Sequence, residues 1–379
     1  MIAENKANRK SVRYSYLPEQ FANPEPILEK IRQLLTRGDF TLGGAVAEFE
    51  NSFAKLIGTK YAVGVGSGTD ALKLALEAAG VGYGDEVITA ANTFIATVGA
   101  INEIGAIPVL VDCTDYYTID ASKIERAITK KTKAIMPVHL TGEVADMEPI
   151  MAIAKKHGLV VVEDACQSIL ASYNGVNAGT FGIAAGFSLH PLKNLNVWGD
   201  AGVVVTNSLE IAEKLRLLRN HGMKNRDEIS LLGHNSRLDT LQAIVGNWLI
   251  PQTADITMNR RKNGAVYDKA FADISQISLA PRRANVAQVF HLYMFEVDAS
   301  IRDKFVTYLL ENGVDAKVHY PIPLPLQEGL KKFGYKRGDF PVTEKQADRV
   351  ISLPVDQHLT KDQINYVIET VTAFFKRGL

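Results

Sequence analysis

The sequence of 379 residues has only two cysteines, Cys113 and Cys166, which lie far apart inside apolar segments. This scarcity gives no basis for a disulfide framework and indicates a reducing compartment, so we expect a cytoplasmic protein. A signal peptide is not expected, because residues 1–16 are polar and basic and contain no apolar core. No apolar run approaches the length of a membrane span, so we expect no membrane partner.

An excess of charge of either sign is also lacking. Lys and Arg together number 42, and Asp and Glu together also number 42. A balanced chain has no broad electrostatic footprint for nucleic acid, so we expect no nucleic-acid partner. The eight histidines show no HxxxH spacing and no CxxC motif accompanies them, so we expect no metal site.

What the sequence does contain is an alternation of short apolar runs with helical patterns. The length is typical of about two domains, and 46% of the residues are hydrophobic. Continuously apolar strands between helices predict a mostly parallel sheet covered on both faces, which is an α/β fold. The predicted strands are residues 61–66, 85–89, 107–112, 134–139 and 159–164, and the predicted helices among them are 71–79, 121–129, 147–157 and one that starts within 90–97.

The last third of the chain has a different, α+β character. Its predicted elements are a strand over 290–297, a helix over 301–311, a strand over 316–318 and a helix over 361–377. We therefore predict a large domain over residues 1–250, which begins with an irregular N-terminal arm (1–20), and a smaller C-terminal domain over 251–379. The basic run 260–262 is interpreted as a solvated helix face.

The first candidate site is Ser67-Gly68-Thr69, between a predicted strand and a predicted helix. Backbone N–H groups at the start of a helix bind phosphate well. The same residues also suit a helix cap that holds no ligand, and this alternative stays open. A dinucleotide fingerprint fits poorly, because the glycines follow GxGxG rather than GxGxxG.

Two further candidates are the acid Asp164 and the amine Lys193. Asp164 ends an apolar strand, where the ligands of parallel sheets bind, although an acid at such a place is often a cap. Lys193 stands in a short interval between two apolar runs. A lysine that is desolvated there loses its proton and becomes a nucleophile toward carbonyl compounds, whereas most loop lysines are merely solvated.

Pyridoxal 5'-phosphate (PLP) requires all three of these features. Its phosphate needs helix N–H donors, its aldehyde needs a lysine, and its ring nitrogen needs an anionic partner. An opposite charge shifts the pKa of such a nitrogen by about 1–3 units, which decides whether the ring is protonated at neutral pH. The residue types and their order therefore predict a PLP site.

Several separated motifs, in order, resemble the DegT/DnrJ/EryC1/StrS family of sugar aminotransferases. The resemblance extends from about residue 40 to about residue 359. The segments that carry it are residues 65–72, 84–88, 163–168, 187–195, 235–243 and 319–324. It implies the type I aminotransferase (aspartate aminotransferase-like) fold, with a large domain built on a mostly parallel sheet and a smaller α+β C-terminal domain.

The resemblance also implies roles for individual residues. Lys193 matches the catalytic lysine that holds the cofactor, and Asp164 matches the partner of the ring nitrogen. Asn235 matches a contact to the phosphate in the neighbouring subunit, which implies a homodimer with shared active sites. The implied cofactor-binding set comprises Ser67, Gly68, Thr69, Phe94 (stacked on the ring), Asp164, Gln167 (near the ring hydroxyl), Ser188, Lys193 and Asn235.

The implied reaction is a ping-pong transamination in amino- and deoxy-sugar biosynthesis. An amino acid, with glutamate favoured, leaves its nitrogen as pyridoxamine 5'-phosphate (PMP), and a keto sugar then accepts it. A nucleotide-linked hexose is the implied acceptor, while a sugar phosphate or a free keto sugar suits the same core. Near the lysine, we favour a packing role for His190 over proton transfer, and Trp198 is a candidate for shaping the substrate pocket.

Three rival functions remain as alternatives. A PLP- or PMP-dependent sugar dehydratase is disfavoured by Lys193, because those relatives replace the lysine. A non-catalytic regulatory paralog is disfavoured by the intact pair of Asp164 and Lys193. A nicotinamide-dependent sugar oxidoreductase is disfavoured by the missing glycine fingerprint.

Overall fold

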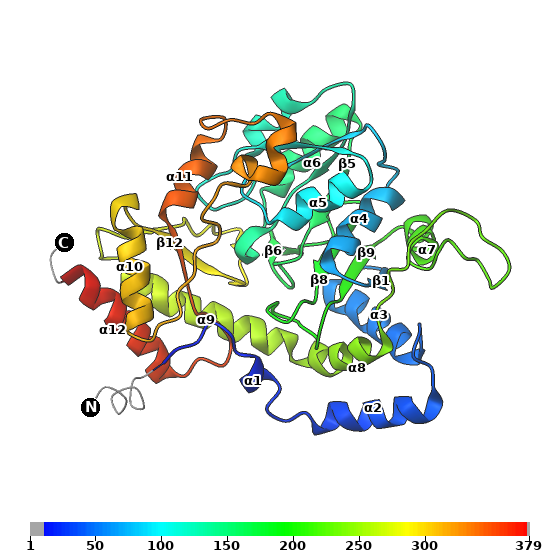
Figure 1. Ribbon diagram of the computed structural model, residues 1–379, viewed down its shortest axis with the longest axis horizontal. Coiled ribbons are helices and arrows are strands. Elements are labelled where there is room, and N and C mark those ends of the chain that lie inside the picture. Colours follow the sequence, from blue (N-terminus) through cyan, green and yellow to red (C-terminus); the bar gives the residue numbers. More distant parts are fainter. Residues whose placement is uncertain (1–10, 377–379) are drawn as a thin grey trace.

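The computed structural model describes residues 11–376, so part of the expected N-terminal arm and the last residue of the expected final helix lie outside them. Its centre is a seven-stranded sheet (Figure 1). In spatial order the strands are β1 (Tyr61–Val65), β9 (Gly202–Thr206), β8 (Ala184–Ser188), β5 (Val160–Asp164), β4 (Thr132–Met136), β2 (Glu86–Ala90) and β3 (Ile107–Val111).

The sheet is mostly parallel, as expected, with one exception. The four pairs among β8, β5, β4, β2 and β3 are parallel, whereas β9 is antiparallel to both β8 and β1. A parallel pairing needs a crossover, usually a helix, and the loop 189–201 between β8 and β9 contains none. The chain therefore returns directly beside β8, and this returning loop carries Lys193.

Helices cover both faces of the sheet, and alternate residues of each strand contact opposite layers. Val162 packs in one cluster with α4 (Gly68–Ala78), α5 (Ile95–Glu103) and α7 (Leu209–Leu218). Its neighbour Val161 packs in another with α6 (Met147–His157). On the face opposite to Val162, the part of the sheet around Phe187 is covered by α2 (Glu25–Arg37), α3 (Gly44–Ile57) and α8 (Thr240–Leu249). This period of two places the consecutive acids at the end of β5 on opposite faces.

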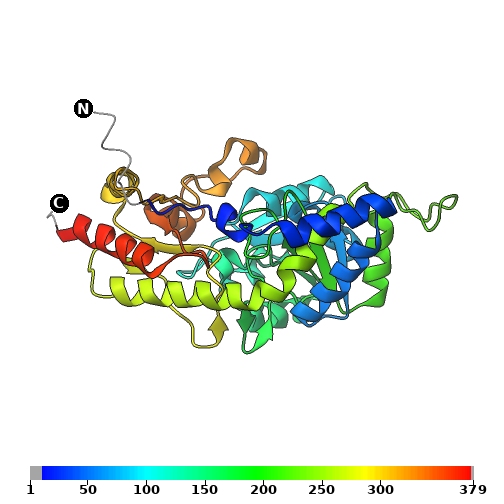
Figure 2. The same cartoon turned by 90° about the horizontal axis from the view of Figure 1, so that it is seen from below.

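The C-terminal region has its own sheet (Figures 1 and 2) and its own apolar cluster. The sheet order is β10 (Ser278–Leu279), β12 (Tyr293–Glu296) and β13 (Val350–Leu353), all antiparallel. Around it pack α9 (Thr253–Phe271), α10 (Ala299–Glu311) and α12 (Lys361–Lys376). The cluster is rich in buried aromatic side chains, among them Tyr267, Phe271, Tyr293, Phe295 and Phe305.

Short elements complete the description. They are α1 (Leu17–Gln20), α11 (Pro341–Arg349), a small sheet of β11 (Val286–Ala287), β6 (Ser172–Tyr173) and β7 (Val176–Asn177), and the 3-10 turns η3 (Leu140–Gly142), η4 (Ile250–Gln252), η5 (Leu324–Leu326) and η6 (Glu328–Phe333). Across residues 11–376, no helix combines the length and the apolar character that a membrane crossing requires. No group of three or more His, Cys, Asp or Glu side chains in this range could hold a metal ion.

Two expected elements are wrong. The helix expected over 121–129 is two 3-10 turns, η1 (Ala121–Lys123) and η2 (Glu125–Ala127), because Ile128 is extended and ends the second turn. The strand expected over 316–318 is a single bridge between Lys317 and Ser352. The helix expected to start within 90–97 does so, since β2 ends at Ala90 and α5 begins at Ile95.

The interpretation of residues 260–262 as a solvated helix face is also wrong for its first member. Arg260 is only 2% exposed and donates from Nε to Gln357 at 2.9 Å and from Nη1 to the Phe290 carbonyl at 3.1 Å. Its guanidinium lies 5.0 Å from the ring centroid of Tyr16. The N-terminal segment and the C-terminal region thus bury the Arg260 guanidinium, whereas the sequence pattern predicted that it would be exposed to solvent.

Candidate active site

A cavity of about 430 Å³ lies where the carboxyl ends of β5 and β8 meet the starts of α4 and α5. It brings together all the expected cofactor-binding residues except Asn235. Those that line it are Ser67, Gly68, Thr69, Phe94, Asp164, Gln167, Ser188 and Lys193. Residues that are up to 126 positions apart in the sequence therefore share one space, as the order of the motifs predicts.

Lys193 is held by a tight turn and by the N-terminal segment. Its backbone N–H donates to the His190 carbonyl at 2.8 Å, and its own carbonyl accepts from the Tyr16 hydroxyl at 2.8 Å. Burial lowers the pKa of the Lys193 amine, although nearby Cys166 and Asp164 act in the opposite direction. A lowered pKa increases the fraction of neutral amine, which is the nucleophilic form.

The start of α4 forms one end of the cavity. Ser67 caps this helix by accepting from the Asp70 N–H at 3.1 Å, so the capping alternative for Ser67 is correct as far as its hydroxyl is concerned. The N–H groups of Gly68 and Thr69 belong to the first turn, where no helical carbonyl precedes them. A Cβ at Gly68 would lie 2.6 Å from the Ser188 Cβ, so only glycine allows α4 to approach β8 this closely.

Asp164 ends β5 at the other side of the cavity. Its carboxylate is 5% exposed and accepts from the Thr97 hydroxyl at 2.7 Å and from the Cys166 N–H at 3.2 Å. The preceding Glu163 lies on the opposite face, where four donors contact its two oxygens. These donors are His139 Nε2 and the N–H groups of Gly179, Phe181 and Gly182. Of the two acids, Asp164 is therefore the one that lines the cavity.

Two aromatic side chains and an amide complete the lining near Asp164. Gln167 accepts from the Thr141 N–H at 2.8 Å, which fixes its oxygen and leaves its nitrogen as the donating end. The rings of Phe94 and Tyr320 lie 5.9 Å apart. Burial raises the pKa of Tyr320 to about 12, while its hydrogen bond with Gln167 acts against this. The phenol is thus a neutral donor at physiological pH.

Three histidines also line the cavity, and burial lowers the pKa of each. The pKa of His319 falls to about 4, and nearby Lys193 contributes to the shift of all three. His190 accepts at Nδ1 from the Leu192 N–H at 3.3 Å, a contact within the lysine loop that agrees with the packing role favoured above. Three neutral imidazoles offer this cavity hydrogen bonds without positive charge.

Two residues singled out in the sequence lie elsewhere. Asn235 is bridged to Asn220 at the base of the loop between α7 and α8, which projects from the body of the molecule (Figures 1 and 2). Trp198 does not line the cavity in the described chain; its ring packs edge-on against Phe21 at 5.6 Å. The idea that Trp198 shapes the substrate pocket stays a prediction.

Sequence reasoning missed several side chains of the site. Thr97 is the most direct of these, since it contacts Asp164, and its spacing of four residues from Thr93 is a helical signal that was available. His291 comes from the C-terminal region just before β12, and no motif marks it. His319 and Tyr320 lie in a segment that carries the family resemblance, but their place in the cavity was not predicted.

A buried lysine of lowered pKa, a carboxylate across the same cavity and an open helix start, all on a mostly parallel sheet, define a PLP-dependent aminotransferase. The particular family is established by similarity over nearly the whole chain. The protein belongs to the DegT/DnrJ/EryC1/StrS aminotransferase family, which it matches over residues 23–372.

Known proteins resemble the chain over almost their full length. A protein from Geobacillus stearothermophilus named "Pleiotropic regulatory protein" is 43% identical over 95% of this chain and 97% of its own. The dTDP-3-amino-3,6-dideoxy-alpha-D-galactopyranose transaminase of Aneurinibacillus thermoaerophilus is 40% identical over 92% and 95%. The crystal structure of S. venezuelae DesV with a ketimine intermediate superimposes with a TM-score of 0.94, at 36% identity, over 97% and 99%.

Proposed function

We propose that this enzyme transfers the amino group of an amino acid, with glutamate as the favoured donor, to the keto group of a nucleotide-linked sugar. Relatives named as transaminases of dTDP-linked sugars, and others named as aminotransferases of UDP-linked sugars, support this substrate class. The observation that carries the reaction type is that Lys193 and Asp164 line a single cavity.

The residues present fit PLP. The cavity of about 430 Å³ has room for a flat six-membered ring between Asp164 and Lys193. The close approach of Gly68 to Ser188 leaves the first turn of α4 open toward the cavity as a phosphate cradle. When bound, the cofactor supplies an electron sink for the negative charge that develops on the substrate carbon.

The chain's own residues then have separate tasks. Lys193 holds the cofactor and moves the proton at the substrate carbon through Nζ, which its lowered pKa suits. Asp164 would accept the hydrogen bond of the ring nitrogen and favour its protonated form. The N–H groups of Gly68 and Thr69, with the Ser188 hydroxyl, would bind the phosphate. Phe94 would pack against the ring.

A sugar acceptor suits the polarity of the cavity. Its three histidines are neutral, and the Tyr320 phenol keeps its proton, so these groups offer hydrogen bonds to hydroxyls rather than charge to a phosphate. This favours a sugar ring in the cavity with its nucleotide outside it over a small sugar phosphate.

Assembly, domain division and location remain part of the proposal. We propose a homodimer in which Asn235, on the projecting loop, contacts the cofactor phosphate of the partner subunit. We keep the division into residues 1–250 and 251–379, which the separate apolar cluster of the C-terminal region supports. A cytoplasmic location agrees with the two free cysteines.

The decisive experiment replaces Lys193 by alanine. We expect K193A to lose the visible absorbance of lysine-bound cofactor and to stop transferring ¹⁵N from glutamate to a panel of nucleotide-linked keto sugars. K156A, which changes an exposed surface lysine, is the matched control and should behave as wild type. Transamination by K193A at the wild-type rate would refute the proposal. A wild-type protein that takes up no cofactor would instead favour a regulatory protein.

A further inference from the structure

Two buried threonines form a hydrogen-bonded chain that ends on Asp164. The Oγ1 atoms of Thr93 and Thr97 are 2.6 Å apart, and Thr97 Oγ1 lies 2.7 Å from Asp164 Oδ2. Thr97 is 0% exposed and Thr93 is 2% exposed. Burial of a hydroxyl is unfavourable unless the hydroxyl is hydrogen-bonded. Valine has the same shape and no such requirement, so the presence of threonine at both positions needs an explanation.

The direction of the protons follows from the chemistry of the acceptor. An ionised carboxylate only accepts, so the Thr97 hydroxyl spends its single proton on Asp164. The short contact with Thr93 must then be made by the Thr93 proton, with Thr97 as its acceptor. The chain of donors therefore runs from Thr93 to Thr97 and from Thr97 to Asp164.

The position of Thr97 in its helix makes this arrangement possible. Within helices, a threonine hydroxyl often donates to the carbonyl four residues before it, as Thr370 does to Tyr366 at 2.7 Å. Thr97 lies in the first turn of α5, and residue 93 is outside the helix. Its hydroxyl is thus directed across to β5 instead of along its own helix.

We propose that Thr93 and Thr97 are positioning residues that keep Asp164 ionised and thereby hold the proton on the ring nitrogen of PLP. This inference rests on the proposed cofactor site. A hydrogen bond donated to a carboxylate favours its charged form over the neutral acid. It therefore favours the ion pair of pyridinium and carboxylate over the neutral pair in which the proton has moved to Asp164.

Two oxygen or nitrogen donors of the described chain contact the Asp164 carboxylate, besides the Cys166 thiol, and the Thr97 hydroxyl is the one of these two that substitution of a side chain removes. The other donor is the backbone N–H of Cys166. The other charged or titratable groups that line the cavity are Lys193, Asp200, Cys166, Tyr320 and the histidines 190, 291 and 319. The same first turn of α5 follows Phe94, so one short segment orients both the face and the nitrogen of the ring.

The test uses holoenzyme prepared with PLP labelled with ¹⁵N at the ring nitrogen. T97V keeps the shape of the side chain and removes the hydroxyl, whereas T97S keeps the hydroxyl. We expect the ¹⁵N resonance of T97V to move toward that of neutral pyridine and its kcat to fall about tenfold to 100-fold. T97S should restore both values, and T93V should shift both in the same direction by less.

Other outcomes overturn the inference. One is a folded T97V whose ¹⁵N resonance is unchanged. Another is that T97V and T97S lose kcat equally while both keep the ¹⁵N resonance of wild type. If T97V does not fold, T93V decides, because it leaves the Thr97 hydroxyl in place, and an unshifted resonance in T93V refutes the inference. Failure of the wild-type protein to bind PLP at Lys193 would refute the proposed function instead.

Discussion

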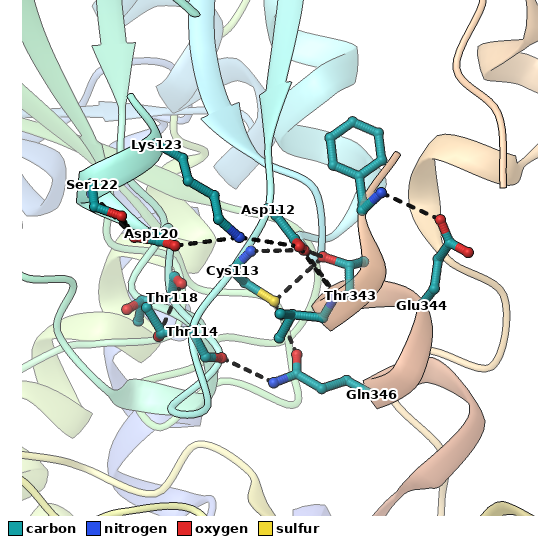
Figure 3. A network of polar contacts seen from close by, with 12 residues as sticks. Asp112, Cys113, Thr114, Thr118, Asp120, Ser122, Lys123, Thr343, Glu344 and Gln346 are labelled. Carbon is teal, nitrogen blue, oxygen red and sulfur yellow. Dashed lines mark hydrogen bonds and ion pairs between the residues drawn. The ribbon is translucent and has the colours of Figure 1, made fainter. Parts of the chain in front are cut away.

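Asp112 and Asp164 occupy corresponding places in one sheet and have different surroundings. Asp164 ends β5 and Asp112 follows β3 directly, so both lie at carboxyl ends of parallel strands, and their exposed fractions are 5% and 4%. Asp164 accepts from two donors of the chain. Asp112 is contacted by five, which are the N–H groups of Val342, Thr343 and Cys113, the Thr343 hydroxyl and the Lys123 ammonium (Figure 3).

The difference shows that place in the fold alone does not make a carboxylate a ligand-binding group. A carboxylate has about four acceptor positions, and the donors around Asp112 fill them. The N–H groups of Val342 and Thr343 belong to the first turn of α11, a helix of the C-terminal region. Through these two hydrogen bonds, Asp112 attaches α11 to the large sheet (Figure 3). Gln346 extends the same contact by donating to the Thr114 carbonyl at 2.9 Å. Asp164 keeps acceptor capacity that the chain does not use.

The largest effect should come from removing the charge of Asp164. In D164N, the ring nitrogen loses an opposite charge that shifts its pKa by about 1–3 units, so we expect the rate of the glutamate half-reaction to fall about 100- to 1,000-fold. The free energy of unfolding should change by less than about 1 kcal/mol, because few donors lose a partner. Single-turnover conversion of the PLP form to the PMP form by glutamate measures the rate. A loss below about threefold would contradict the role of Asp164.

The next effect should be one of stability, from the corresponding change at Asp112. D112N turns an amide toward N–H donors at the start of α11 and leaves several of them unpaired. We expect the free energy of unfolding to fall by about 2–4 kcal/mol. Urea denaturation measures this, and the folded holoenzyme should keep its kcat within about threefold of wild type. If D112N instead loses activity as D164N does, the distinction between the two carboxylates is wrong.

Much of this distinction was accessible from the sequence, and the rest depends on packing. Apolar strands and glycine-bearing turns are local patterns, so they predicted the sheet, the helix start after Ser67 and the acid at the end of β5. The contact between Thr97 and Asp164 depends on how α5 is placed over β5, and the burial of Arg260 depends on an N-terminal segment remote in sequence. Three of the five donors of Asp112 come from Val342 and Thr343, 230 and 231 positions later, beyond the reach of any local pattern.

The smallest effect concerns the pH dependence of stability. Burial acts to raise the pKa of Asp112, but the N–H groups of Thr343 and Val342 outweigh it and hold that pKa below its usual value of 3.8. Because the folded-state pKa is the lower one, this carboxylate stabilises the fold fully above the unfolded value. Its contribution is lost as the pH falls through the folded value.

The stability difference between wild type and D112N should therefore be constant from neutral pH down to roughly pH 5 and shrink below about pH 4. Each unit by which the pKa is lowered corresponds to about 1.4 kcal/mol, so the change is modest. Urea denaturation of both proteins across this range measures it. T343V removes one donor hydroxyl of Asp112. In the T343V background, the part of the unfolding free energy that acid removes should therefore be smaller than in wild type. A difference between wild type and D112N that stays constant through the acid range would show that geometry, rather than the charge of Asp112, fastens α11 to the sheet.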